Sequence, residues 1–228
     1  MAFLIAYFMI PKPPSRWNSG RAVGPRTALT PDMLARLIAD LTARGDLHDL
    51  ALLATGVDTM LRASDLLRLK VGDVQLASGH IREQLFWRQQ KTGANVAPVL
   101  TEFARTSLAA WIAKSGKRRD DYLFTRTKPG SAGPIKPGCY RRLVKAWLRR
   151  IGIDPADYSS HSIRRTKPAF MYRAGCPVAD ISKLLGHKTP AATLEYLGVT
   201  TERLRAQALK YDVFAARART AVSQAKTG

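Results

Sequence analysis

Two histidines, an arginine and a tyrosine gather in one C-terminal stretch of this sequence. His161 and Arg164 belong to the run His-Ser-Ile-Arg, and Tyr196 follows His187 by nine residues in LLGHKTPAATLEYLGV. A phenol can act as a nucleophile when a base lies nearby. Arginine suits a phosphate because its planar guanidinium makes two parallel, charge-assisted hydrogen bonds. Together these residue types indicate attack on a phosphodiester, with the tyrosine forming a covalent bond to phosphorus.

Further candidates lie upstream. Arg62 opens the run Arg-Ala-Ser-Asp-Leu-Leu, which follows shortly after a Thr-Gly pair at positions 55–56. Burying an arginine among leucines without a partner would be costly, and Asp65, three residues later, can serve as that partner on one helix face. Lys91 lies in the polar segment 90–95. An arginine, an aspartate and a lysine thus join the C-terminal candidates.

The order and spacing of these residues resemble the tyrosine recombinase (phage integrase) family. The matching segments are 55–74, 161–166 and 184–199, and the resemblance spans about residues 30–210, the extent of that family's catalytic domain. It implies a site-specific DNA recombinase that cuts and rejoins one strand at a time. The intermediate would be a 3′-phosphotyrosyl link, which stores the bond energy, so that neither a cofactor nor a metal ion is expected.

The resemblance implies a role for each candidate. Tyr196 would attack phosphorus, Arg62 and Arg164 would clamp the scissile phosphate, and Lys91 would donate a proton to the leaving 5′ oxygen. The remaining three would assist: His161 and His187 by hydrogen-bonding the phosphate or helping to deprotonate the tyrosine, and Asp65 by supporting the first arginine.

Two local features depart from the family pattern. Arg165 stands where many members have a histidine, which adds positive charge. Pro168 lies four residues after Arg164, where a helix is expected, and an interior proline costs about 3 kcal/mol and bends a helix. If the helix starts near Ser162, the proline would kink it. If the helix starts nearer Lys167, the proline falls in the first turn and the cost disappears.

Alternative roles for the same residues stay open. Each candidate taken singly could be an ordinary core, rim or solvated side chain, and only their joint occurrence in order favours chemistry. A type IB topoisomerase would use nearly the same residues to relax DNA without pairing two sites. A non-catalytic DNA-binding accessory protein would keep the fold and the charge but form no covalent adduct.

The charge balance indicates a polyanionic partner, here double-stranded DNA. Lys and Arg number 37 against 17 Asp and Glu, a net charge of +20, and the basic residues alternate with apolar ones along the whole chain. This pattern favours a folded binding face over a detachable basic tail. The two cysteines and the spacing of the histidines indicate neither a disulfide framework nor a zinc site.

The periodicity predicts a mainly α fold with a small antiparallel β-sheet, an α+β class like the tyrosine recombinase catalytic domain. Thr30-Pro31-Asp32 opens a helix that Gly45 ends. The predicted short strands are 74–76, 80–87 and 96–99, with Lys91 at the second turn. Further helices are expected at about 48–56, from 62, 102–114, 138–151, 162–175, 178–186, 190–197 and 201–225.

The chain divides into three predicted parts: an apolar segment with a Pro/Gly-rich linker (1–29), a catalytic domain (30–210) and a C-terminal helical tail (211–228). The apolar opening is too short to span a membrane, so no membrane partner is expected. The resemblance implies a homo-oligomer, a tetramer on DNA, or a partner recombinase. It also implies a bacterial cytoplasmic, nucleoid-associated protein, encoded on a mobile element.

Overall fold

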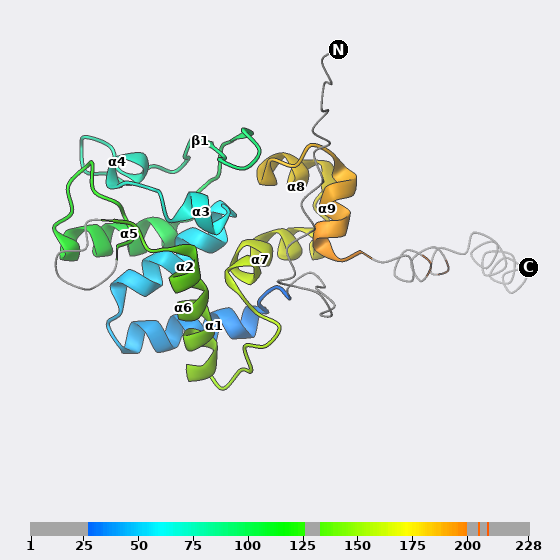
Figure 1. Ribbon diagram of the computed structural model, residues 1–228, viewed down its shortest axis with the longest axis horizontal. Coiled ribbons are helices and arrows are strands. Elements are labelled where there is room, and N and C mark those ends of the chain that lie inside the picture. The colour runs from blue at the N-terminus through cyan, green and yellow to red at the C-terminus, as the bar shows by residue number, and fades with distance from the viewer. Residues whose placement is uncertain (1–26, 126–132, 200–204, 206–208, 210–228) are drawn as a thin grey trace, which may run out of the picture.

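The computed structural model describes residues 27–125 and 133–199, together with Arg205 and Leu209. In these ranges the chain is mostly helical and carries one two-stranded antiparallel sheet (Figure 1), which confirms the predicted fold class. The elements are, in order, α1 (Pro31–Ala43), α2 (Leu47–Thr59), α3 (Ala63–Leu66), α4 (Val71–Val74), β1 (Trp87–Arg88), β2 (Asn95–Val96), α5 (Glu102–Ser115), α6 (Pro137–Arg150), α7 (Ser160–Arg173), α8 (Val178–Leu185) and α9 (Pro190–Leu197).

The start of α1 follows the predicted capping pattern. The Thr30 hydroxyl accepts a hydrogen bond from the Met33 amide (3.2 Å), and Pro31 occupies the first helical position. Met33, Leu37 and Leu41 recur at helical spacing and are buried, so this helix presents one apolar stripe to the core. The helix ends at Ala43, and Gly45 then takes a left-handed conformation (φ +61°), as predicted.

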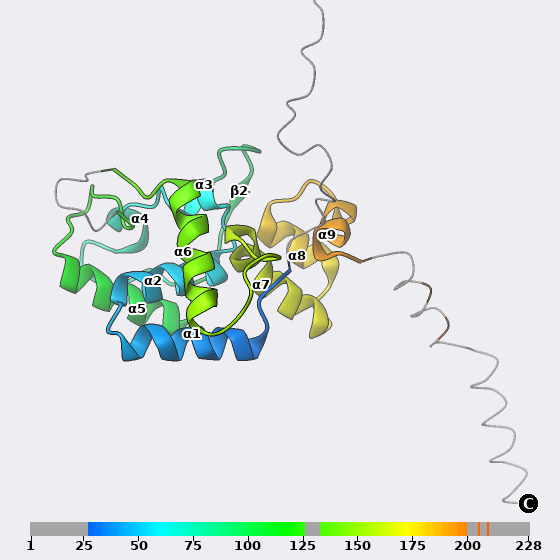
Figure 2. The same cartoon turned by 60° about the horizontal axis from the view of Figure 1, so that its bottom comes forward.

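Helix α2 lies at the centre of the main core and packs on α1, α5 and α7 (Figure 2). It is buried on almost all sides, including the polar Asp49. The Asp49 carboxylate accepts hydrogen bonds from the indole of Trp147 and from the ring of His48, each at 2.7 Å. These bonds offset the cost of burying the carboxylate and join α2 to α6.

The sheet is smaller than the sequence predicts. Residues 71–74 form the short helix α4 instead of leading into a strand, and the Asp73 carboxylate accepts from the Lys70 amide at its start (2.7 Å). The predicted strand 74–76 is therefore wrong, apart from one isolated bridge between Gln75 and Ile81. Regular pairing is limited to the register Trp87↔Val96 and Arg88↔Asn95.

The structure places Leu29 outside the predicted linker and decides between the two predicted starts of α7. Leu29, assigned to the linker, is buried, and its amide donates to the Thr166 hydroxyl (3.1 Å), because an apolar side chain beside α1 gains by joining the core. Helix α7 begins at Ser160, so Pro168 is interior and the first-turn alternative is wrong. The helix nevertheless continues to Arg173.

The last two described helices pack with the end of α2 and with α7 in a small, separate apolar cluster. Met60, Ile181 and Leu185 are buried together, and Tyr196 packs against them. In Figure 2, α8 and α9 lie at one end of the molecule, beyond α7. In the described ranges no helix is both long and apolar enough to cross a membrane. The whole predicted tail (211–228), most of the predicted helix 201–225, and residues 1–26 lie outside the described residues.

Candidate active site

Arg164 lies at the junction of the two clusters. It is buried (3% exposed), and its guanidinium donates to the backbone carbonyls of Met60 and of Leu185, the latter at 3.2 Å. Burial lowers the pKa of Arg164, because desolvation penalises the charged form. The arginine on α7 thus joins the end of α2 to the end of α8 before any ligand is bound.

Met60 adopts an unusual backbone conformation to make this contact. It ends α2 in the left-handed region (φ 51°, ψ 23°) and is the non-glycine residue with positive φ in the described part of the chain. Such a conformation costs a non-glycine residue about 1 kcal/mol or more. Two contacts of Met60 offset this cost: its side chain is buried, and its carbonyl accepts a hydrogen bond from Arg164.

Arg62 and Asp65 do not form the predicted pair. Arg62 is the N-cap of the four-residue helix α3 and has an extended backbone (φ −62°, ψ 149°). Its guanidinium donates to the side-chain oxygen of Gln89. The Asp65 carboxylate instead accepts from the Gln90 amide (3.0 Å), and no ion pair joins it to Arg62 among the described residues.

Tyr196 on α9 is surrounded by cations and a histidine. The guanidinium carbons of Arg165 and Arg164 lie 5.0 and 6.0 Å from its ring centroid, and the His187 ring packs edge-on at 5.3 Å. The Tyr196 hydroxyl is buried and makes no hydrogen bond of normal geometry with the described residues. Burial raises the pKa of Tyr196, while Arg164, Arg165 and Arg62 oppose that rise.

His187 is held as a neutral imidazole. Its Nδ1 lies 2.9 Å from the Thr193 hydroxyl, one turn into α9. Desolvation, followed by the charges of Arg164 and Arg62, lowers the pKa of His187 to about 4. A neutral ring at physiological pH can accept a proton, which a cation cannot.

His161 and Lys91 are more accessible to solvent. His161 lies in the first turn of α7, where packing against the protein and then the charges of Arg164, Arg141 and Arg165 lower its pKa. Lys91 is exposed in the turn between β1 and β2. Within the described ranges, no hydrogen bond or ion pair joins Lys91 to the other candidates, although the turn lies toward α8 in Figure 1.

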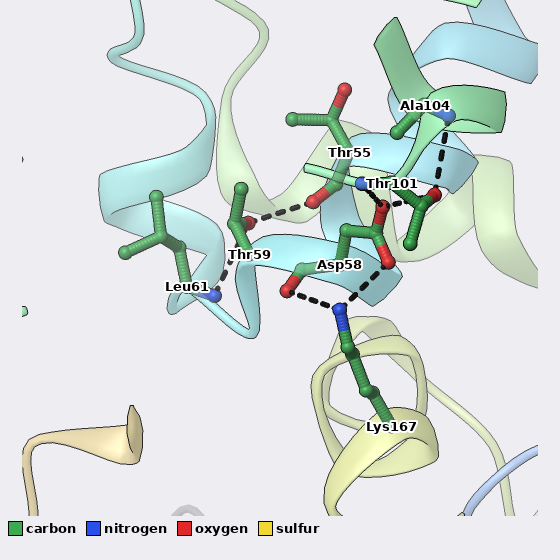
Figure 3. Close-up of polar contacts among 7 residues, drawn as sticks. All are labelled: Thr55, Asp58, Thr59, Leu61, Thr101, Ala104 and Lys167. Carbon is green, nitrogen blue, oxygen red and sulfur yellow. Dashed lines mark hydrogen bonds and ion pairs between the residues drawn. The ribbon is translucent and has the colours of Figure 1, made fainter. Parts of the chain in front are cut away.

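A partly buried ion pair holds α7 against the core (Figure 3). The Lys167 ammonium lies 2.9 Å from one oxygen of the Asp58 carboxylate, whose other oxygen accepts from the amide (2.7 Å) and the hydroxyl (2.6 Å) of Thr101. The three residues come from α7, α2 and the N-cap of α5. This network fixes the helix that carries Arg164 one turn before Lys167.

Most of the chain matches a known protein family. The model of the phage integrase family matches residues 27–203. This chain belongs to the phage integrase family. A putative integrase/recombinase, y4gC of Sinorhizobium fredii (strain NBRC 101917 / NGR234), is 31% identical over 179 residues, which cover 75% of this chain and 85% of y4gC.

Two further similarities concern larger proteins. Tyrosine recombinase XerA of Saccharolobus solfataricus (strain ATCC 35092 / DSM 1617 / JCM 11322 / P2) is 30% identical over 154 residues, 68% of this chain and 47% of XerA. The crystal structure of XerH site-specific recombinase bound to difH substrate, a pre-cleavage complex, has a TM-score of 0.62 at 18% identity, covering 83% of this chain and 55% of XerH. The integrase-family chain thus spans about half the length of these two proteins.

The structure gathers most of the predicted site residues of this integrase-family chain. Arg62, Arg164, His161, His187 and Tyr196 lie close enough for the charge of one to shift the pKa of another. Among the described residues, no group of three or more His, Cys, Asp or Glu side chains could hold a metal ion.

Sequence reasoning missed two residues at the site. Gln89 is buried (2% exposed) and contacts Arg62, and Met60 supplies a carbonyl to Arg164. In the structure Leu85 and Gln89 are buried and Phe86 is exposed, as in an alternating strand. The sequence does not show this alternation, because Leu85 and Phe86 are both apolar. No local pattern marks Met60.

Proposed function

We propose that this chain is a site-specific DNA recombinase in which Tyr196 is the nucleophile and double-stranded DNA is the substrate. The observation that carries the proposal is the surroundings of Tyr196: two arginines face its ring and a neutral histidine packs against it. A lone tyrosine on a helix needs none of these neighbours. The family match and the net charge of +20 support the same conclusion.

The proposed reaction is a transesterification. The Tyr196 oxygen attacks phosphorus, a 3′-phosphotyrosyl bond forms, and the bond from phosphorus to the 5′ oxygen breaks. Neutral His187, or His161, takes the phenol proton, and Lys91 gives a proton to the leaving oxygen. Rejoining reverses each step, so the strand is restored without an added energy source.

The arginines have donors to spare for a phosphate. A guanidinium carries five N–H groups, and two contacts of Arg164 go to the carbonyls of Met60 and Leu185. Arg62, bound to Gln89, faces the same set of residues. Fixed donors aimed at a phosphoryl group stabilise the charge that develops on its oxygens in the transition state. We assign Asp65 the role of holding the turn that carries Lys91, through its bond to the Gln90 amide.

Assembly and cellular context extend this proposal. Residues 30–210 would form the catalytic domain and 211–228 a tail, with a homotetramer or a partner recombinase on DNA. DNA as a substrate suits a bacterial cytoplasmic protein associated with the nucleoid, and a gene on a mobile element. Activity of this kind needs two DNA sites held together, which one catalytic domain cannot supply.

A suicide substrate tests the covalent step. Duplexes nicked just beyond candidate cleavage positions, drawn from sequence flanking the native gene, trap the adduct because the short cleaved strand diffuses away. We expect a slow-migrating protein–DNA band on a denaturing gel with the wild-type chain and none with Tyr196→Phe. Clear DNA binding without a band from either protein would support the accessory-protein alternative. A two-site assay on the active protein then separates a recombinase from a type IB topoisomerase.

A second test isolates Lys91. Replacing it in Lys91→Ala should slow adduct formation on ordinary DNA by about 10²-fold or more, because a general acid is lost. A substrate with sulfur at the 5′-bridging position has a leaving group that needs no proton, so it should be cleaved at close to the wild-type rate. Equal slowing on the two substrates would remove Lys91 from the acid role.

A further inference from the structure

Gln89 occupies the point where the hairpin, α3 and α8 meet. It follows β1 directly, and its side chain is almost fully buried (2% exposed). A primary amide carries one acceptor oxygen and one nitrogen with two donors. Burying it without partners would cost about 1–3 kcal/mol, so its contacts determine what it does.

The amide oxygen accepts hydrogen bonds from two residues with different tasks. One donor is the guanidinium of Arg62, and the other is the hydroxyl of Thr92 at 3.0 Å. Thr92 is the neighbour of Lys91 in the exposed turn. One oxygen atom therefore links the first arginine of the clamp to the turn that carries the candidate acid.

The amide nitrogen contacts the other side of the site. It donates to the Leu185 carbonyl at 3.0 Å, the same oxygen that accepts from Arg164 at 3.2 Å. Leu185 ends α8, and Gly186 follows with φ +66° and leads into His187. A Cβ on Gly186 would lie 3.1 Å from this nitrogen and 2.8 Å from Val96, so the hairpin and the end of α8 are in direct contact.

The backbone around Gln89 closes the Lys91 turn. The Gln89 amide donates to the Ala94 carbonyl, and the Gly93 amide donates to the Gln89 carbonyl, each at 2.9 Å. The next amide, that of Gln90, is held by Asp65 at 3.0 Å. The turn is thus fixed on both sides of the residue whose side chain reaches Arg62 and α8.

We propose that Gln89 is a positioning residue that sets Arg62, the Lys91 turn and the α8–His187 junction in one arrangement. It touches neither DNA nor the reacting atoms and acts through Arg62. The expected effect of Gln89 on cleavage rests on the proposed function. Its effect on the arrangement of Arg62, the Lys91 turn and the end of α8 does not. An amide is required because the site needs an acceptor for Arg62 and a donor to Leu185 in one side chain; methionine, of similar length, offers neither donor nor a strong acceptor.

The experiment compares Gln89→Met with Gln90→Met, a change to the same residue type one position later, where the side chain is exposed. Adduct formation is measured on a suicide substrate cleaved by the wild type, and on the same duplex with a neutral methylphosphonate at the scissile position. A neutral linkage needs less compensation of charge by an oriented arginine. We expect Gln89→Met to slow cleavage of the phosphodiester by about 10²-fold and of the methylphosphonate by far less. Affinity for DNA should change by less than about twofold, since no cation is removed, and Gln90→Met should match the wild type.

Hydrogen exchange on the same variants is a second measurement, which does not depend on activity. Hydrogen exchange should speed up at the amides of residues 89–96 and 185–188 in Gln89→Met, while exchange in α1 and α2 stays unchanged. Equal slowing of both substrates, or unchanged exchange in the two segments, would overturn the positioning role. If Gln89→Met proves too unstable, Gln89→Glu keeps an acceptor for Arg62, loses the donor to Leu185, and should show faster exchange mainly at 185–188. Should the wild type form no adduct on either substrate, the proposed function fails and exchange alone decides the geometric part.

Discussion

Helices α1–α7 and the α8–α9 pair are stabilised by cores of very different size. The first contains the largest fully buried side chains, among them Trp147, Tyr140 and Phe124. The second rests on Met60, Ile181 and Leu185, with Tyr196 packed at its edge. Because burial of apolar area is the main stabilising term in folding, the two regions should differ in how readily they open.

The difference divides the proposed chemistry between a rigid and a less rigid part. Arg164 belongs to α7, which the Asp58–Lys167 pair fixes to α2, whereas Tyr196 belongs to the weakly packed α9. Elements with few buried contacts open locally at a lower free energy than the global core. If the proposed roles hold, Arg164 would stay in place as part of the phosphate clamp while Tyr196, the proposed nucleophile, is repositioned.

The largest expected effect is on adduct formation, when one arginine of the more rigid region is removed. Arg62→Ala should reduce adduct formation by about 10²- to 10³-fold, as expected when one preorganised donor to a developing charge is lost. Non-specific DNA affinity should change little, because Arg62 is one of 37 basic residues. Arg68→Ala, at an exposed position nearby, is the control. A collapse of affinity or of folding with Arg62→Ala would make this residue structural.

Matched core truncations compare the two regions directly. Leu52 and Ile181 are both fully buried, one in each cluster. Leu52→Ala should lower the free energy of unfolding by about 3 kcal/mol. Ile181→Ala should lower it less and should instead accelerate hydrogen exchange in residues 178–197. If the two variants lost equal free energy of unfolding and Ile181→Ala showed no faster exchange in residues 178–197, then α8 and α9 would unfold as one unit with the main core.

Removing the carboxylate that holds α7 should have a smaller effect. Asp58→Ala leaves the Lys167 ammonium and the Thr101 amide without their partner, and should lower the free energy of unfolding by about 2 kcal/mol. Asp32→Ala, which removes an exposed pair with Arg36 (3.7 Å), should cost less than about 0.5 kcal/mol. Thermal unfolding of the two variants measures the contrast. Similar losses of stability in the two variants would show that the Asp58 network does not anchor α7.

A last expected effect is a pH dependence of stability in the α8–α9 region. The pKa of His187 is lowered to about 4 in the folded chain, against about 6.5 when unfolded. Between these values the unfolded chain binds a proton that the folded chain does not, so stability falls as pH falls from 6.5 toward 4. His187→Gln should flatten this part of a stability profile, whereas His80→Gln, at an exposed loop position, should not. An unchanged slope would show that His187 is not desolvated as described.

Much of the fold could be predicted from the sequence because its signals are local. The Thr30-Pro31 cap, the apolar stripe of α1 and the helices α5, α6, α8 and α9 appear within a residue or two of their predicted places. The sheet could not be predicted as well, because the turn at Lys70–Asp73 is closed by a side-chain bond that redirects the chain into α4.

The sequence by itself determined the chemistry available to this protein: a tyrosine, arginines, histidines and a lysine in a recognisable order, and a strong positive charge. Only the tertiary structure decided which residues of the chain these side chains contact. Arg62 binds Gln89 and not Asp65, and Arg164 binds carbonyls 104 and 21 residues away. Spacing along a helix reports neighbours within one or two turns. Contacts over longer separations depend on how the helices and the hairpin pack, which no local pattern encodes.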